Sequence, residues 1–331
     1  MKIFEITLLF LGSVIGAGFA TGAEIITFFG DLRLPTWIIA IVIGLTMFAI
    51  ITLEVLLNYP NKNRITPLKT NYATKPTLTT KIFDVISLLT YFILFTAMTA
   101  GITSITNPFI AILSLIISAV IVLFGFHKLS RLNLYIVLVI IVLIITTALP
   151  HLNSSSPKVD YHFNDVPNSI FWACLYAGLN CFMFPELIKA VAIKNNKRTL
   201  IWAAITTAIV LSILVALILN TITYEQTTTE SIPLLAAAPN FITIIIILLA
   251  ILTSQYTALF VIMQRVLNLI NIKKNRPLPK IVGITCICSL AFAISFCGFN
   301  QIINFAYPLI GAFTCFFLLI SWLTSYFRSQ V

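Results

Sequence analysis

Long apolar runs separated by short polar segments cover almost the whole chain. A membrane-spanning helix needs about 20 mostly apolar residues. Runs of about that length lie roughly at 3–30, 36–58, 82–104, 109–126, 132–150, 168–192, 200–222, 240–263, 281–299 and 302–327. The pattern predicts an all-α integral membrane protein with about ten transmembrane helices. No linker rich in Pro, Gly or Ser divides the chain, so residues 1–331 are predicted to form a single transmembrane domain.

Composition and charge agree with this class. The chain is 60% hydrophobic and 9% charged, which is typical of membrane proteins. Its net charge of +10 would suit a nucleic-acid partner if the charges were clustered, but they fall in alternate loops. If the N-terminus is cytoplasmic, all of the 20 Lys and Arg except Arg33 and Lys158 lie on the cytoplasmic side. The positive-inside rule therefore predicts cytoplasmic N- and C-termini, contact with the lipid bilayer and no nucleic-acid partner.

Two of the apolar runs contain residues that interrupt helices. The first has four glycines in eleven residues, at positions 12, 16, 18 and 22, and the sixth contains Gly178, Asn180 and Pro185. Glycine weakens a helix, and proline removes a backbone donor. The glycines alone would also suit close helix packing through small residues. The matching features of the sixth run favour the alternative, in which both helices are discontinuous.

The two predicted interruptions lie about half a chain length apart. Four uninterrupted runs follow each one, and the first and sixth runs cross the membrane in opposite directions. This layout predicts a five-plus-five inverted repeat, with repeat one at about 1–150 and repeat two at about 165–331. Such repeats with discontinuous helices are typical of secondary transporters that bind their solute near the midplane.

A broken helix exposes free amides and free carbonyls inside the membrane, where they can bind a solute. Amides near Gly18 and Gly22 favour an anionic group such as a carboxylate. Glu24 either caps its half-helix, holds a solute amine or carries a proton, and Tyr91 either donates its hydroxyl to the solute or simply packs. The predicted substrate-binding residues are Gly16, Ala17, Gly18, Gly22, Glu24, Tyr91 and Asn180.

A coupling-ion site is predicted beside the first break. The carbonyls of Gly12 and Ile15 face a segment of the eighth run that contains Ala250, Thr253 and Ser254. Such an all-oxygen site of low charge suits sodium, although Ser and Thr in membranes commonly bond back to their own helix. No other cofactor is expected. The six cysteines all fall in apolar runs, where they behave as small apolar residues.

Other polar residues are assigned to the ends of runs. Glu54 and Asp84 are expected at the cytoplasmic interface, and Glu186 either caps a half-helix or contributes to function. The polar start of the last run is a candidate external gate, and it contains Asn300, Gln301, Asn304 and Tyr307.

The segment from Gly16 to Glu24 resembles the first-span signature of the YkvI family of bacterial membrane proteins, with Ala23 in place of an expected glutamine. Gly178, Asn180 and Pro185 agree with that resemblance. It implies the amino acid-polyamine-organocation superfamily, a LeuT-like fold and a bacterial cell (inner) membrane location. The sodium-site pattern of LeuT-like transporters also implies roles for Gly12, Ile15, Ala250, Thr253 and Ser254. Residues 132–149 contain no basic residue, which favours sodium over a lysine-based proton mechanism.

Three functions are weighed on these observations. The leading hypothesis is a cation-coupled, sodium-dependent symporter of a small solute such as an amino acid or amine, working by alternating access. The alternative is a solute-sensing receptor subunit that is similar to membrane subunits of spore germinant receptors and binds without net transport. An enzyme is not expected, because His127, His151 and His162 lie in or beside loops and no His-Glu-x-x-His spacing occurs.

Overall fold

The computed structural model describes residues 3–59, 78–124, 126–151, 165–182, 184–193, 195–269 and 277–328, and within these ranges all regular structure is helical. The helices of the first half are α1 (Ile3–Val14), α2 (Ala17–Thr21), α3 (Ala23–Phe29), α4 (Thr36–Asn58), α5 (Leu78–Ile105), α6 (Pro108–Phe124), α7 (Phe126–Ala148) and the short 3-10 turn η1 (Leu149–His151). Those of the second half are α8 (Val166–Cys181), α9 (Phe184–Ala192), α10 (Lys197–Tyr224), α11 (Pro233–Ala237), α12 (Phe241–Leu269), α13 (Pro277–Ser295) and α14 (Phe299–Arg328).

The described helices confirm a multi-pass, all-helical membrane protein. Seven of them are long and apolar enough to cross a bilayer: α4, α5, α7, α10, α12, α13 and α14. The other three predicted runs correspond to α1 with α2 and α3, to the shorter α6, and to α8 with α9. Each apolar run therefore has a helical counterpart, while the count of ten crossings and the inverted repeat stay predictions.

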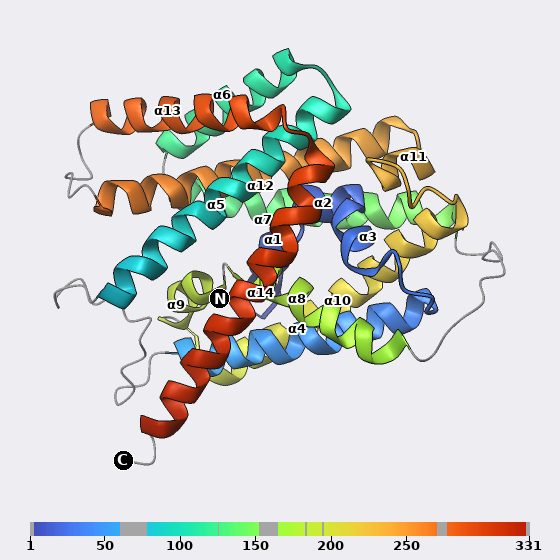
Figure 1. Cartoon of the computed structure of the whole chain (residues 1–331), viewed down its shortest axis with the longest axis horizontal. Helices are drawn as coiled ribbons and strands as arrows, with labels where there is room; N and C mark the ends of the chain where they lie inside the picture. The colour runs from blue at the N-terminus through green and yellow to red at the C-terminus, as the bar shows by residue number, and fades with distance from the viewer. Residues whose placement is uncertain are drawn as a thin grey trace.

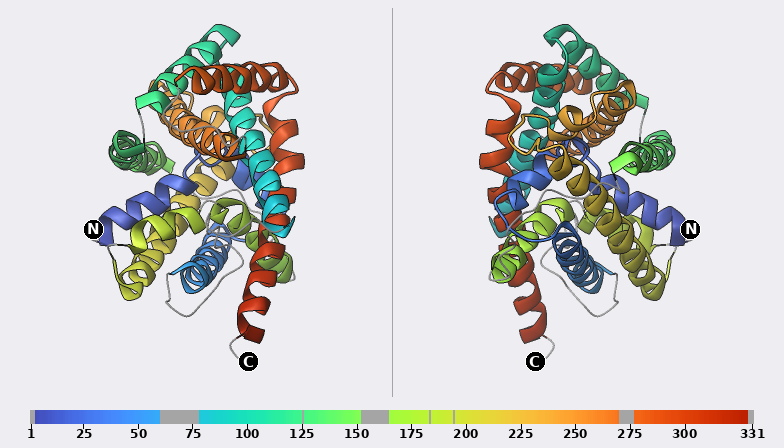
Figure 2. Two further views of the ribbon diagram at one scale, coloured as in Figure 1. Left: turned by 90° about the vertical axis from the view of Figure 1, so that its left-hand side faces the viewer. Right: turned by 90° about the vertical axis from the view of Figure 1, so that its right-hand side faces the viewer.

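The helices form a bundle whose two ends differ. In Figure 1 the end of α4, the start of α5, the end of α12 and the start of α13 lie toward the left, whereas α3 and α11 lie toward the right. The charge pattern assigns the left-hand ends to the cytoplasm. In Figure 2, α1 runs from the outer edge of the bundle, beside the label N, toward the middle, where α2 lies. Their position explains why Phe10 and Phe19 are fully buried.

The first run is interrupted at Gly16 and again at Gly22, whereas the sequence predicted a single break within its glycine cluster. Helix α1 ends at Val14, and Gly16 has an extended backbone (φ −110°, ψ −167°) before α2 begins. Gly22 then adopts the left-handed conformation (φ 78°), which glycine accepts without steric cost, and α3 starts at Ala23. In the second half, α8 ends at Cys181 and α9 starts at Phe184. Both discontinuities lie where the sequence places them.

The two interrupted helices touch each other on either side of their breaks. The rings of Phe10 in α1 and Phe184 in α9 lie 4.8 Å apart, centroid to centroid. Beyond the breaks, Phe28 and Phe29 of α3 pack edge-on against Tyr176 of α8, at 5.5 and 5.7 Å. Helix α1 therefore packs against α9, and α3 packs against α8.

Helices α8 and α14 cross at close range because both have glycine at the crossing point. A methyl group added at Gly178 would lie 2.6 Å from the Gly311 carbonyl oxygen, and one added at Gly311 would overlap the Leu175 carbonyl. Beside the crossing, the Cys315 thiol donates a hydrogen bond to the Cys174 carbonyl over 3.2 Å. Neither helix therefore has room for a side chain at this contact.

Replacing Gly311 by alanine is expected to destabilise the protein by about 1–3 kcal/mol, because the methyl group forces two backbones apart. The thermal unfolding midpoint in detergent measures this loss. Gly283→Ala is the matched control. The nearest atom to a methyl group there is the flexible end of Met263, at 3.0 Å. Equal midpoints for the two variants would contradict the close crossing.

Candidate functional site

The centre of the candidate site is the carboxylate of Glu24. Because Gly22 turns the chain in the left-handed conformation, Glu24 falls in the first turn of α3, and its side chain folds back over α2. A methyl group added at Gly18 would lie 2.6 Å from Glu24 Oε2. The side chain is only 4% exposed. An acidic group so placed inside a membrane protein is costly, which makes it a functional candidate.

Asn180 links this carboxylate to the other interrupted helix. Its Nδ2 donates to Glu24 Oε1 over 2.9 Å and to the Tyr176 carbonyl, one turn earlier in α8, over 3.0 Å. Asn180 lies close to the end of α8, just before the break. The structure therefore brings together three of the predicted substrate-binding residues, Gly18, Glu24 and Asn180.

Two buried phenols complete this centre. A methyl group added at Gly18 would lie 3.3 Å from Tyr307 Cε2, a ring carbon next to the one that carries the hydroxyl. Tyr307 and Tyr176 are 1% and 0% exposed, and neither hydroxyl has a hydrogen-bond partner among the described residues. Sequence reasoning missed Tyr176. The sequence feature that could have indicated Tyr176 is its spacing of four residues from Asn180, which places both side chains on one face of α8.

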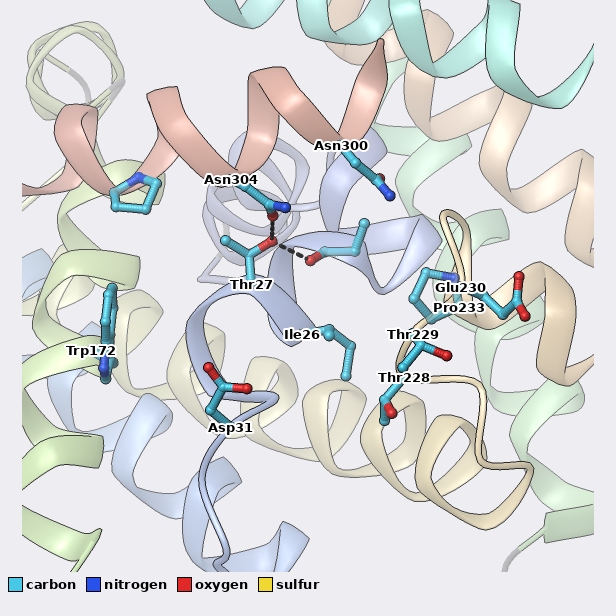
Figure 3. A pocket seen from close by; sticks show the side chains of 12 residues that line it. Ile26, Thr27, Asp31, Trp172, Thr228, Thr229, Glu230, Pro233, Asn300 and Asn304 are labelled. Atoms are coloured by element: carbon cyan, nitrogen blue, oxygen red, sulfur yellow. Dashed lines mark hydrogen bonds between the residues drawn. The ribbon is translucent and has the colours of Figure 1, made fainter.

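A polar pocket lies beside this centre, on the predicted external side, and Figure 3 shows the residues that line it. It has a volume of about 350 Å³. Its lining comes from α3 and the segment after it, from α8, α14 and α11, and from the segment before α11: Ala23, Ile26, Thr27, Asp31, Trp172, Thr228, Thr229, Glu230, Pro233, Asn300, Asn304 and Pro308. We call this cavity the outer pocket.

The outer pocket and the Glu24 centre are adjacent but distinct, because Glu24 is 4% exposed and does not line the pocket. Ala23 and Thr27 line the pocket on either side of Glu24 in the chain. Thr27 Oγ1 lies 2.7 Å from Asn304 Oδ1, which joins α3 to α14 across the floor (Figure 3). Asn300 and Asn304 line the pocket, as the external-gate prediction requires. Gln301 does not, because it faces an apolar groove of about 840 Å³ between α5 and α14.

The predicted cation-site residues lie where α12 packs against the first break. A methyl group added at Gly16 would lie 3.1 Å from Ser254 Oγ. The Gly16 amide bonds to the Val14 carbonyl, over 2.8 Å, and so leaves the Gly12 carbonyl without its usual helical partner. Among the described residues, no backbone amide donates to the Ile15 carbonyl. The assignment of these oxygens to a sodium ion stays a prediction.

Thr253 and Ala250 have a local interaction that competes with this assignment. The Thr253 hydroxyl donates to the Ala250 carbonyl over 2.9 Å, within its own helix. This is the back-bonding that membrane hydroxyls commonly make. A sodium ion that bound the Thr253 hydroxyl and the Ala250 carbonyl would compete with this hydrogen bond, so the role of both oxygens as ligands stays a prediction.

Tyr91, another predicted substrate residue, packs in a different cluster. Its ring lies 5.1 Å from that of Phe182, beside the break after α8, and the Arg265 guanidinium lies 5.6 Å from its centroid. Tyr91 is 2% exposed and belongs to an apolar cluster with Tyr256 and Leu259. These contacts favour the packing interpretation, and Phe182 and Arg265 are neighbours that sequence reasoning missed.

Glu54, predicted at the cytoplasmic interface, lies in the last turn of α4 and is buried against other helices. Its side chain is 2% exposed, and Asn58, one turn later in α4, donates to its Oε2 over 2.5 Å. The burial follows from the packing of α4 against α8 and α9. The side chains of Asp84 and Glu186, two further acids assigned from the sequence, lie outside the described residues.

Comparisons with known proteins bear on the fold. No family model matches the chain, and no curated protein matches its sequence. A crystal structure of a point mutant of the Eremococcus coleocola manganese transporter is similar, with 11% identity and a TM-score of 0.58, and the match covers 96% of this chain and 78% of that one. The same transporter in complex with an aromatic bis-isothiourea substituted compound gives 11% identity and a TM-score of 0.52, covering 98% and 77%.

The chain has the fold of a membrane transporter. These structural neighbours are transporters and not enzymes. At 11% identity the structural similarity shows only the fold. The resemblance to the YkvI family stays an expectation from the sequence.

Replacing Asn180 by leucine is expected to destabilise the protein by about 1–3 kcal/mol or more, because it removes the hydrogen-bond donor to the buried Glu24 carboxylate. Thermal unfolding of the purified protein measures this. The double variant Asn180→Leu with Glu24→Leu is expected to recover part of the loss, since the buried carboxylate is removed together with its donor. Purely additive losses in this cycle would show that the two side chains are not coupled.

Tyr91→Phe is expected to keep full solute affinity, because the ring contacts with Phe182 and Arg265 remain. Tyr91→Ala is expected to lower the unfolding midpoint, since it leaves a cavity in the cluster. Unfolding curves and solute titrations of the two variants measure both effects. A selective loss of solute affinity in Tyr91→Phe would instead restore the substrate-binding role of its hydroxyl.

Proposed function

We propose that this protein is a secondary transporter that carries a small amine-bearing solute across the membrane by alternating access, with sodium as the coupling ion. The observation that carries the proposal is the Glu24–Asn180 hydrogen bond, which joins two interrupted helices through a buried carboxylate. The transporter fold of the structural neighbours supports it.

The position of the breaks argues for a solute site. Non-helical backbone inside a membrane is tolerated only where it is buried in protein or lines a cavity. Here both breaks face each other, and the residues between them include a carboxylate, an amide and two unpartnered phenols. Such a concentration of polar groups serves no packing purpose, since an apolar core would avoid their desolvation.

The separation of the outer pocket from the Glu24 centre supports alternating access. Glu24 does not line the pocket, and the Thr27–Asn304 contact joins α3 to α14 at the pocket. Breaking this contact would admit solute from the outer pocket. On the other side of the breaks, Phe10 and Phe184 hold α1 against α9, so separating them would release solute inward.

The donors around Glu24 favour an organic solute over a metal ion. Although the neighbours are described as manganese transporters, no group of three or more His, Cys, Asp or Glu side chains that could hold a metal comes together in the described part of this chain. The phenols of Tyr176 and Tyr307 are better suited to hydrogen-bonding an organic molecule. Sodium, as coupling ion, is assigned to the separate oxygens near Gly16 and Ser254.

The double variant Thr253→Ala with Ser254→Ala is expected to lower the apparent sodium affinity for solute uptake by at least about tenfold, because two proposed ligands are lost. Uptake into proteoliposomes, measured against sodium concentration, tests this. Thr285→Ala is the control. That hydroxyl also bonds back to its own helix, but it is exposed on α13. Unaltered sodium dependence would overturn the sodium assignment, and solute binding without accumulation would favour a receptor subunit over a transporter.

A further inference from the structure

Glu24 occupies the side of the first break where a solute carboxylate would otherwise bind. Its Oε2 lies 2.6 Å, and its Cβ 2.9 Å, from the position of a methyl group on Gly18. The carboxylate thus covers the segment between Gly18 and Gly22, whose amides the sequence assigned to an anionic solute group. A second carboxylate here would face a like charge in a medium of low dielectric constant, which is strongly unfavourable.

The groups around Glu24 need a partner that donates hydrogen bonds. Asn180 is the donor to Glu24 among the described residues, and it reaches Oε1. A carboxylate has room for about four hydrogen bonds. The hydroxyls of Tyr176 and Tyr307 are also unpartnered among the described residues, although both side chains are almost fully buried. An ammonium group, with up to three N–H donors and a positive charge, would satisfy these oxygens.

The outer pocket also favours a cation. Two of its lining residues, Asp31 and Glu230, are acidic, and its described lining contains no Lys, Arg or His. Acidic groups at the mouth of a cavity raise the local concentration of cations and speed their association. Trp172 adds an aromatic ring to the lining, on the opposite side of the pocket from Glu230 (Figure 3), and aromatic rings attract ammonium groups.

We propose that the solute is a cationic amine without a carboxylate, whose ammonium group binds Glu24 beside Tyr176 and Tyr307 after entering through the outer pocket. This assignment rests on the proposed function, because it names the solute class of the same site. An α-amino acid fits less well. Its ammonium group would bind, but its carboxylate would lie close to Glu24 or, on the way in, to Asp31 and Glu230.

Matched pairs of ligands test the assignment. The full-length protein is titrated with putrescine against ornithine, cadaverine against lysine, and tyramine against tyrosine, with the thermal unfolding midpoint as the readout of binding. Each amine differs from its amino acid by the carboxylate alone. We expect at least one amine to bind at least about tenfold more tightly than its parent amino acid. The inference is overturned if no amine shifts the midpoint, or if a parent amino acid binds as tightly as its amine.

Two sets of variants locate the binding. Glu24→Gln keeps an oxygen for Asn180 but loses the charge, so amine affinity should fall at least about thirtyfold, the lower end for removing one partner of a buried charge pair. Asp31→Asn with Glu230→Gln should weaken amine binding at low salt and much less at high salt, since exposed charges are screened. Glu5→Gln, an exposed acid at the start of α1, is the control and should change nothing. Unchanged amine affinity in Glu24→Gln would overturn the assignment.

Uptake of the radiolabelled compounds into proteoliposomes separates this inference from the proposed function. An amine that binds through Glu24 without accumulating leaves the solute class intact and overturns the transporter assignment. Accumulation of an amino acid, with no binding of its amine, overturns the solute class and leaves the transporter assignment intact.

Discussion

The hydrogen bond from Asn180 to Glu24 is the interaction on which the centre of this protein depends. A carboxylate buried in a membrane protein is costly unless it is hydrogen-bonded or paired. Its donor comes from the other interrupted helix, so both helices must end near the same point for the bond to form. The glycines at positions 16, 18 and 22 make this possible, because they end α1, leave room for the Glu24 side chain and turn the chain into α3.

The remaining contacts join each half of one interrupted helix to a half of the other. Phe10 and Phe184 join α1 to α9, whereas Glu24 and Asn180 join α3 to α8. The glycine crossing at Gly178 then fixes α8 to α14, the helix that carries Tyr307 and Asn304. Helix α8 is therefore in close contact with the helix whose Asn300 and Asn304 line the outer pocket. The same contacts that build the site connect it to the residues predicted to form an external gate.

The sequence predicted those features that depend on local composition. Apolar runs located the helices, and the clustered glycines together with Asn180 located the breaks, because both effects act within one segment. It did not predict the burial of Glu54, the partners of Tyr91 or the apolar surroundings of Gln301. Membrane helices are apolar on all sides, so their sequence does not show which face meets another helix. Those features depend on packing between segments far apart in the chain.

The orientation of α12 shows how such packing determines a site. Gln255 follows Ser254 and is fully buried. Its Nε2 donates to Thr99 of α5 over 3.2 Å, and its Oε1 accepts from Ser118 of α6 over 3.1 Å. Successive residues of a helix point in directions about 100° apart. The hydrogen bonds of Gln255 hold one face of α12 against α5 and α6. Ser254, on a different face of α12, then points toward Gly16. The position of the proposed sodium site therefore depends on the hydrogen bonds of Gln255.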